Sequence, residues 1–487
     1  MDARAGAPSA ASSDAAASLG RALLFDATER SFDVTGIEGR VPAWIRGSYY
    51  INGPARFTRG GRRYNHWLDG DGMVCALHFT QESVRFASRF VVTRKLADEE
   101  AAGAFLYRGF GTAFAGDRLR RNLMLESPVN VNVSAWGDRL LAFGEQSLPM
   151  ELHPHSLATI GEFDFRGAIN EVSPFAAHAK LDPQSGNLVN FGISYAASRP
   201  VLHLYEFEPA GHLLRRRRVP LDLPHSNHDF GLTARHAVFF LSPLTMDFTR
   251  FVGDRLSVMD SLDWQPALGS RIVVAPRRAD AGAAFSLPAG AAYCLHLINA
   301  FERGTELTVD ILEMETPVYP DYQPMPALFS VAPPCQPVRY VVDLATHTLR
   351  ERRPMAYGLA ADFPSIDARR LTSEYDDFWM LGISATGSSG PKFFDQLAHA
   401  SWSHDGVGDV YRTPAGLLAG EPVFVGNPAE PGEGVVIVQH LDTARHRAAF
   451  LLFDAFAVHK GPIARLPLGG PLHPLFHASF HPAVSSA

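Results

Sequence analysis

Cysteine is scarce in this chain of 487 residues, which has only Cys75, Cys294 and Cys335. Three widely separated cysteines form neither a disulfide framework nor a CxxC metal site. Such sparing use of cysteine is typical of a reducing compartment, so we expect a cytoplasmic protein.

Excess positive charge and long hydrophobic runs are also lacking. The formal net charge is −7, whereas a nucleic-acid-binding domain carries a basic face or stripe. No stretch approaches the roughly 18 uninterrupted apolar residues of a membrane-spanning helix. We expect no nucleic-acid partner, no membrane span and no obligate protein partner, while peripheral contact with a membrane stays open.

The first twenty residues are rich in alanine and serine and lack the charged start and apolar run of a signal peptide. We predict that residues 1–20 form a disordered tail. No linker interrupts the rest, so residues 21–487 are expected to form a single catalytic domain.

Glycine and proline are abundant, at 41 and 35 residues, and they separate short runs rich in Val, Phe, Leu and Tyr. Residues 140–144, 188–194 and 237–241 are examples. Short apolar runs between turn residues predict an all-β fold. With 46% hydrophobic residues and 33 Phe, the chain can fill a large apolar interior.

One hairpin pattern recurs along the chain: an apolar strand that ends in an acidic residue, a short polar turn, then a polar strand. Copies begin near residues 151, 180, 205, 340 and 451. Weak repeats of one hairpin are the expected trace of a β-propeller, although a pair of β-sandwiches remains open. The four arginines at 215–218 fall on the outer strand of one copy, where charge protects a solvated edge; a phosphate or lipid-headgroup patch is the alternative.

Four of the 20 histidines stand beside or within apolar strands: His178, His228, His296 and His477. They are separated by 50, 68 and 181 residues in turn, so each would come from a different blade. Because the innermost strands of a propeller converge on its axis, such distant residues can share one site.

Nine segments in order resemble the carotenoid cleavage oxygenases. They are GSYYINGPARF, HWLDGDGMVCALHF, LLAFGEQSLPMELHP, FAAHAKLDP, SNHDFGLT, LHLINAFE, DFPSID, GEPVFV and LFHASF. The resemblance implies a seven-bladed β-propeller with a loop and helix dome over an iron site. It also implies a non-haem Fe(II) dioxygenase that cleaves a C=C double bond of a lipophilic carotenoid or apocarotenoid to two carbonyl products, with dioxygen as co-substrate.

Carried over by position, the resemblance makes His178, His228, His296 and His477 the iron ligands and catalytic centre. Imidazole suits Fe(II), and four neutral imidazoles leave two positions of an octahedron open. A tetrahedral zinc site closed by four ligands would leave no room for chemistry. The least typical member is His477, because two other histidines lie nearby and Ala478 replaces the family's usual glycine.

In the family, three glutamates hold the outer ring nitrogens of three ligands, which fixes the tautomer and orientation of each ring. Glu145 and Glu421 match two of these positions, and Asp362 stands at the third. Since aspartate is one methylene shorter, its reach to a histidine would need a bridging water or a shifted ligand loop.

Two further segments have more than one interpretation. In HWLDGDGM, the residues His66, Asp69, Asp71 and Gly72 could form a cation loop or an ordinary turn; the family resemblance favours a structural role. Residues 241–264 mix apolar and charged side chains and could form part of the dome, a membrane-dipping tunnel mouth or a buried dome helix.

The substrate class is predicted from an absent lysine. Relatives that cleave stilbenes hold the phenolic oxygen with a tyrosine and a lysine. Tyr107 matches the tyrosine and is a candidate substrate-binding residue, but no lysine lies shortly before residues 126–133, where the pattern places it. Without a cation, a phenolate would be desolvated in an apolar tunnel, which favours a carotenoid or apocarotenoid. Arg118, Arg120 or Arg121 could replace the lysine, so a stilbene or phenylpropanoid substrate stays the alternative.

Two other functions remain to be separated from cleavage. An isomerase of the same family would use the iron to polarise an ester. A non-catalytic carotenoid-binding propeller would not need four clustered imidazoles, and it would carry no stoichiometric metal.

Overall fold

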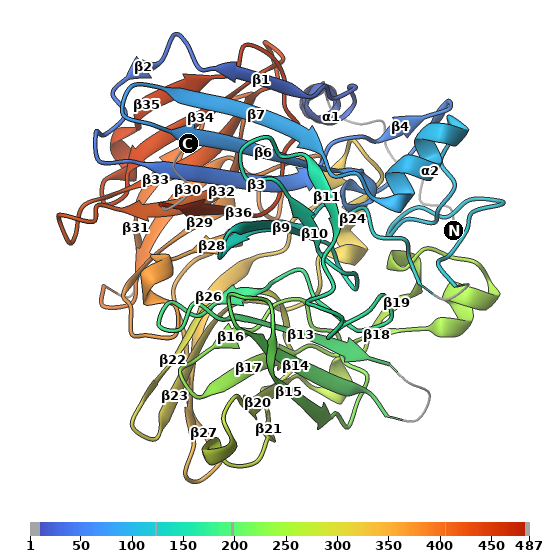
Figure 1. Cartoon of the computed structure of the whole chain (residues 1–487), viewed down its shortest axis with the longest axis vertical. Coiled ribbons are helices and arrows are strands. Elements are labelled where there is room, and N and C mark those ends of the chain that lie inside the picture. The colour runs from blue at the N-terminus through green and yellow to red at the C-terminus, as the bar shows by residue number, and fades with distance from the viewer. Residues whose placement is uncertain (1–9, 122–123, 196–198, 405, 483–487) are drawn as a thin grey trace.

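The structure, a computed structural model, describes residues 10–121, 124–195, 199–404 and 406–482 (Figure 1). Within these ranges, seven antiparallel sheets of four or five strands make up most of the chain. They are the blades of a seven-bladed β-propeller, which confirms the predicted all-β propeller over a pair of sandwiches. We number the blades 1 to 7 around the ring.

The first four blades have the following strands, each sheet given in its spatial order. Blade 1 contains β1 (Arg30–Asp33), β7 (Val84–Phe90), β6 (Gly72–Phe79), β3 (Gly47–Pro54) and β36 (Ala478–His481). Blade 2 contains β11 (Thr159–Glu162), β10 (Met150–Leu152), β9 (Arg139–Phe143) and β8 (Asn132–Trp136). Blade 3 contains β12 (Lys180–Leu181), β13 (Leu188–Ser194), β14 (Val201–Phe207) and β15 (Leu213–Pro220). Blade 4 contains β16 (Gly231–Leu232), β17 (His236–Leu241), β20 (Arg271–Pro276) and β21 (Phe285–Pro288).

The other three blades complete the ring. Blade 5 contains β22 (Tyr293–Arg303), β23 (Glu306–Met314), β26 (Cys335–Asp343) and β27 (Thr348–Pro354). Blade 6 contains β28 (Ala360–Ser365), β29 (Asp377–Ile383), β30 (Gln396–Ser401) and β31 (Gly406–Arg412). Blade 7 contains β2 (Glu38–Gly39), β35 (Pro462–Pro467), β34 (Arg447–Asp454), β33 (Gly434–Asp442) and β32 (Leu417–Gly426).

The two ends of the chain close the ring together. The C-terminal strand β36 pairs with β3 in blade 1, while β2, the second strand of the chain, pairs with β35 in blade 7. Blue and red strands therefore lie side by side in Figure 1. Because β36 also packs against β8 and β32, it lies at the innermost position of its blade.

The elements outside the blades are short. Two helices are present among the described residues, α1 (Ala10–Leu23) and α2 (Arg94–Ala102). Small two-stranded sheets and single helical turns occupy the long connections: β4 (Thr58–Arg59), β5 (Arg62–Arg63), β18 (Leu244–Met246), β19 (Leu262–Trp264), β24 (Tyr322–Gln323), β25 (Leu328–Phe329), η1 (Trp67–Asp69), η2 (Thr249–Gly253), η3 (Met259–Ser261), η4 (Pro266–Leu268), η5 (Ala279–Ala281), η6 (Tyr319–Asp321), η7 (Ala368–Arg370) and η8 (Val458–Lys460). With α2, the β18–β19 and β24 segments lie to the right of the blades in Figure 1, where they form the predicted dome.

The N-terminal segment differs from the predicted tail. Residues 1–9 lie outside the described part of the chain, but from Ala10 the chain forms α1, where a disordered tail was expected up to residue 20. Leu19 and Leu23 are buried in the main core, and Arg21 donates a hydrogen bond to the Thr443 carbonyl. The alanine content that suggested disorder also gives high helix propensity, and packing against the propeller stabilises the helix.

The fold also places the two segments whose role the sequence left open, residues 215–218 and residues 241–264. The four arginines at 215–218 lie on β15, the outermost strand of blade 3, as predicted for a solvated edge. Residues 241–264 form β18, the π-helical turn η2 and β19, and they expose Phe248, Val252 and Leu256. A buried dome helix is therefore not present there. No helix in the described ranges is long and apolar enough to cross a membrane.

A buried ion network fixes α2 to the HWLDGDGM segment. The Lys95 ammonium, 1% exposed, lies 2.7 Å from Asp71 and 3.1 Å from Glu99. Asp71 also pairs with Arg59 at 2.9 Å. Burial alone would lower the pKa of Lys95, but the neighbouring carboxylates outweigh burial and raise it. Both acidic groups of this segment are thus committed to internal partners, because Asp69 accepts hydrogen bonds from the Gly111 amide and the Thr112 hydroxyl. This supports the structural interpretation over a cation loop.

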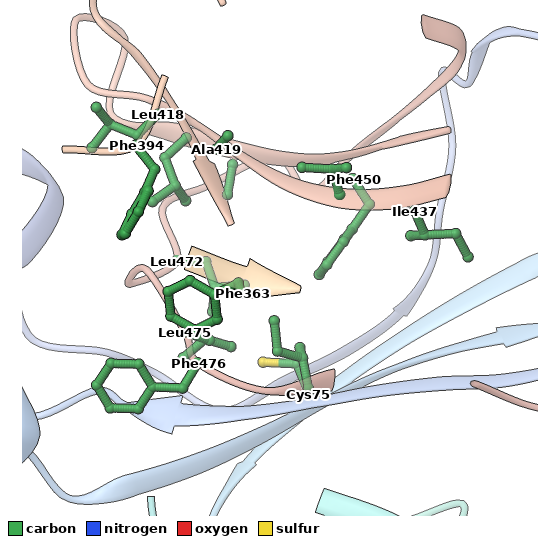
Figure 2. Close-up of a cluster of buried hydrophobic side chains, with 14 of the residues drawn as sticks. Cys75, Phe363, Phe394, Leu418, Ala419, Ile437, Phe450, Leu472, Leu475 and Phe476 are labelled. Carbon is green, nitrogen blue, oxygen red and sulfur yellow. The ribbon is translucent and has the colours of Figure 1, made fainter. Parts of the chain in front are cut away.

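The main hydrophobic core extends toward the propeller axis. Figure 2 shows Phe363, Phe394 and Phe476 beside Leu472 and Leu475 in this cluster. Phe363 and Phe394 belong to blade 6, and Phe476 precedes β36 of blade 1, so this cluster joins two blades.

Replacing Lys95 by methionine tests the importance of the buried network. The change keeps most of the side-chain volume but leaves Asp71 and Glu99 without their cation. We expect the free energy of unfolding to fall by about 3–5 kcal/mol, measured by urea denaturation. The control Lys460→Met, on an exposed turn, should change it by less than about 0.5 kcal/mol. A loss below about 1 kcal/mol for Lys95→Met would contradict the role of the network.

Candidate metal centre and adjoining cavity

The innermost strands of four blades bring together the four predicted histidines. His178 precedes β12, His228 lies just before β16, His296 is on β22, and His477 immediately precedes β36. These strands belong to blades 3, 4, 5 and 1. His178, His296 and His477 are buried, and His228 is half-buried. Residues up to 299 positions apart in the sequence thus meet on the axis of the ring.

The four imidazoles form a compact cluster. One ring nitrogen from each lies within 4.8 Å of the others. The closest pair is Nε2 of His178 and Nε2 of His228, at 2.9 Å. Two nitrogens that bind one ion at right angles, each at about 2.1 Å, would lie about 3 Å apart. The spacing therefore fits a shared metal ion.

A carboxylate stands behind three of the rings. His296 Nδ1 hydrogen-bonds Asp362 Oδ1 at 2.5 Å, and His477 Nδ1 hydrogen-bonds Glu421 Oε1 at 2.8 Å. His228 Nδ1 lies 2.7 Å from Glu145 Oε1.

These contacts determine where the ring protons sit. A carboxylate accepts, so it keeps the proton of the imidazole on Nδ1 and leaves a lone pair on Nε2. Nε2 of His296 is buried and has no hydrogen-bonding partner among the described residues. Burial and the other three imidazoles lower the pKa of His178 far below its usual value, so this ring is neutral. Lone pairs that converge without protons are a donor set for a cation.

Backbone irregularities direct three of these side chains toward the axis. The register of β22 against β23 shifts between Cys294 and Leu297, around His296. The register of β28 against β29 shifts after Asp362, and that of β32 against β33 shifts between Ala419 and Pro422, around Glu421. A β-bulge adds a residue to one strand and re-aims its side chain. Regular strands would alternate these residues strictly between the two faces.

The bulge in β28 also explains how an aspartate can replace a glutamate. Asp362 contacts His296 directly, without the bridging water that its shorter side chain suggested. Phe363, the next residue, has a φ of 53°, and the Phe363 amide donates a hydrogen bond to Asp362 Oδ1. This local distortion moves the carboxylate closer to the ring.

The fourth ring has a different neighbour, which the sequence reasoning missed. His178 Nδ1 lies 3.9 Å from Asp229 Oδ1, and Lys180 Nζ pairs with the same oxygen at 2.7 Å. Burial opposes ionisation of Asp229, but Lys180 outweighs it and lowers the pKa of the carboxyl. A sequence signal existed, because Lys180 and Asp229 follow His178 and His228 within two residues.

The two histidines near the C-terminal candidate lie elsewhere. The ring of His473 is stacked on Phe25 with centroids 3.8 Å apart. His481 accepts a hydrogen bond from the Ala135 amide. Both rings are therefore engaged in packing, and His477 is the member of the cluster.

An apolar cavity adjoins the cluster. His228, His296, His477 and Asp362 line one part of it. The remaining wall is made mostly of apolar side chains: Trp67, Leu68, Val131, Leu295, Met314, Val318, Phe329, Ala332, Pro333, Ala360, Ala361, Phe363, Ile383, Phe394 and Phe476. Three aromatic residues with a polar atom, His66, Tyr319 and Tyr322, complete it. No lysine or arginine lines the cavity within the described part of the chain.

Tyr107 and the nearby arginines do not line this cavity. The Tyr107 hydroxyl donates to Asp98 Oδ2 at 2.5 Å. Arg120 and Arg121 both pair with Glu171. The structure thus gives Tyr107 an internal partner, and neither Tyr107 nor Arg120 nor Arg121 is among the described residues that line the cavity.

Comparisons with known proteins agree with this fold. The family model described as "Retinal pigment epithelial membrane protein" matches residues 24–482. The chain is 30% identical to apocarotenoid-15,15'-oxygenase of Synechocystis sp. over 454 residues, which is 90% of this chain and 91% of the relative. It is 27% identical to isoeugenol monooxygenase of Pseudomonas nitroreducens, with 92% and 94% covered.

A solved structure extends the similarity to three dimensions. The crystal structure of the cobalt-substituted Synechocystis enzyme has a TM-score of 0.88 to this chain at 28% identity, covering 95% of this chain and 98% of the other. Family match, sequence identity and fold agree along nearly the whole length. The chain therefore belongs to the retinal pigment epithelial membrane protein family, the carotenoid cleavage oxygenases.

Proposed function

We propose that this chain is an Fe(II)-dependent dioxygenase that cleaves one C=C double bond of an apocarotenoid or carotenoid to two carbonyl products. The observation that carries the proposal is a buried cluster of four imidazoles beside an apolar cavity that no lysine or arginine of the described residues lines. A non-catalytic carotenoid-binding propeller would need the cavity but not the cluster.

The donor set supports iron as the metal. Four imidazole ligands without a carboxylate or thiolate favour a borderline metal ion such as Fe(II) over calcium or magnesium. His178, His228, His296 and His477 would hold the ion, which would supply the activation of dioxygen that a C=C cleavage requires.

The residues of the chain itself hold the ligands, orient the substrate and exclude water. Asp362 and Glu421 hydrogen-bond Nδ1 of His296 and His477 and fix the tautomers of these rings, and Glu145 lies 2.7 Å from Nδ1 of His228. Phe363, Phe394 and Phe476 form an apolar wall next to the cluster. A dry wall of this kind keeps a polyene in place by apolar burial and prevents side reactions with water.

The apolar wall supports an apocarotenoid as substrate. A polyene loses nothing from the absence of a cation, whereas a phenolate would be desolvated there without compensation. The relative from Synechocystis is an apocarotenoid oxygenase by name. Exposed Phe248, Val252 and Leu256 support peripheral contact with a membrane, where lipophilic substrates accumulate.

A phenylpropanoid is the second candidate, because one phenol partner is available. The Tyr319 hydroxyl is on the cavity wall, and relatives named isoeugenol monooxygenase and lignostilbene dioxygenase are 27% identical to the chain.

Removal of a ligand tests the metal centre. His228→Ala and His296→Ala should each abolish cleavage and most of the iron content, because three imidazoles leave a loose and hydrated site. Iron is measured by atomic absorption on purified protein. The control His212→Ala, on an exposed residue paired with Glu208, should retain both. Full iron occupancy and normal turnover in His228→Ala would contradict the assignment.

Variants of Asp362 test whether the bulge in β28 is adapted to the short aspartate side chain. Asp362→Asn keeps the length but removes the charge, and we expect iron affinity or rate to fall roughly 10- to 100-fold. Asp362→Glu should also lose iron affinity, because the direct 2.5 Å contact leaves no space for another methylene. Metal affinity is measured by competition with a chelator. If Asp362→Glu binds iron as tightly as the parent protein, the bulge has not adapted to the shorter side chain.

Substrate preference tests the interpretation of the cavity. The catalytic efficiency of the iron-loaded enzyme should be higher for an apocarotenal than for a 4-hydroxystilbene. Tyr107→Phe should leave this ratio unchanged, because the Tyr107 hydroxyl is bound to Asp98 away from the cavity. A clear preference for the phenol that disappears in Tyr107→Phe would show that the phenylpropanoid is the substrate.

A further inference from the structure

His66 is a polar residue in a largely apolar cavity wall. It precedes the turn η1, and its Nδ1 accepts a hydrogen bond from the Leu68 amide at 3.0 Å. A neutral imidazole has one donor and one acceptor nitrogen. Because Nδ1 accepts, the ring proton is on Nε2.

The Nε2 proton of His66 has no acceptor among the described residues. The side chain is 3% exposed, and Nε2 is buried without a hydrogen-bonding partner. Burial lowers the pKa of His66 to about 3, so the ring stays neutral at physiological pH. A buried donor without a partner costs about 1–3 kcal/mol. An acceptor supplied by a ligand would remove that cost.

Packing holds the ring of His66 in place. The ring is stacked on Tyr322, with centroids 3.7 Å apart, and meets Phe110 edge-on at 5.1 Å. The Tyr322 hydroxyl is itself fixed, because it accepts a hydrogen bond from the Trp67 amide at 2.7 Å. Gly111 allows the close approach, since a Cβ there would lie only 2.3 Å from Cβ of His66. The donor is therefore preorganised, which lowers the cost of binding.

A second donor, Tyr319, also packs against Phe110. The Tyr319 ring lies 5.4 Å from Phe110, and Tyr319 lines the same cavity. Its hydroxyl is 3.4 Å from that of Tyr293. The Tyr293 hydroxyl is the donor in this pair, so the Tyr319 proton is free for a ligand. Burial raises the pKa of Tyr319 to about 12, so the proton is retained.

We propose that His66 and Tyr319 form a binding corner for the carbonyl oxygen of the substrate, so that the enzyme selects a polyene with an aldehyde or ketone group. This inference rests on the proposed function, because it takes the cavity to be the substrate site. A carbonyl oxygen only accepts hydrogen bonds, and the corner offers two donors. A carboxylate would need a cation, and none lines the cavity within the described ranges.

The experiment measures binding of two ligands to the iron-free protein. One ligand is an apocarotenal, and the other is a hydrocarbon polyene of equal length. Affinity is followed by quenching of protein fluorescence, and the visible absorption of the bound aldehyde reports the hydrogen bond to its carbonyl. His66→Phe keeps the aromatic stack without Nε2–H. His66→Asn keeps an acceptor for the Leu68 amide, but its side chain is too short to reach the cavity. This variant therefore removes the Nε2–H donor and retains the hydrogen bond to the Leu68 amide.

We expect both His66 variants to weaken apocarotenal binding about 3- to 10-fold, the loss of one neutral hydrogen bond, and to leave hydrocarbon binding unchanged. The absorption maximum of the bound aldehyde should shift to shorter wavelength. Tyr319→Phe should act in the same direction, while the control Tyr107→Phe should change nothing. Thermal unfolding shows whether each variant is folded.

Equal weakening of both ligands, or no change in either, would overturn the carbonyl corner. The outcome for the proposed function is separate. An aldehyde that binds with the His66-dependent shift but is not cleaved by the iron-loaded enzyme refutes the cleavage proposal alone. Cleavage without any His66-dependent discrimination refutes the corner alone.

Discussion

The Nδ1 atoms of three buried imidazoles each face a carboxylate from another blade. Glu145 of blade 2 lies beside His228 of blade 4, Asp362 of blade 6 beside His296 of blade 5, and Glu421 of blade 7 beside His477 of blade 1. Because a carboxylate only accepts, each contact leaves the opposite nitrogen of the ring as a lone pair directed at the axis. The capacity of the cluster to hold a cation depends on these carboxylate–imidazole contacts. The same contacts align the blades around the axis, because each one joins two blades.

Irregular strands bring these carboxylates and histidines into contact. Around His296, Asp362 and Glu421 the register of the inner strand shifts against its neighbour. Unpaired backbone and distorted dihedrals cost stability at each position. The ring tolerates them because its ends are sealed by β36 and β2, which tie the two termini into blades 1 and 7.

Outside the cluster, the buried charges of the dome support the fold, whereas the cavity wall is mostly apolar. The dome contains a buried cation, Lys95, but this side chain is neutralised by Asp71 and Glu99 and supports α2. The cavity has an apolar wall with isolated neutral donors such as His66. A mostly apolar wall suits a long conjugated hydrocarbon, and neutral donors add selectivity without the desolvation cost of an ion.

The sequence by itself determined the all-β class and the recurring hairpin, because the short apolar runs and turns that predict them are local. The family resemblance of its ordered motifs singled out the four histidines, which the structure brings into one cluster. It also identified Glu145, Asp362 and Glu421, but it could not place Asp362 against His296, since that contact depends on a bulge and on Phe363 in a left-handed conformation. Helix α1 was missed because its stability comes from packing of Leu19 and Leu23 on distant segments. Tertiary structure alone decided that the Tyr107 hydroxyl binds Asp98. It also decided that His66 and Tyr319 share a wall and that no lysine or arginine of the described ranges lines the cavity, because these relations join residues far apart in the chain and depend on the closure of the ring.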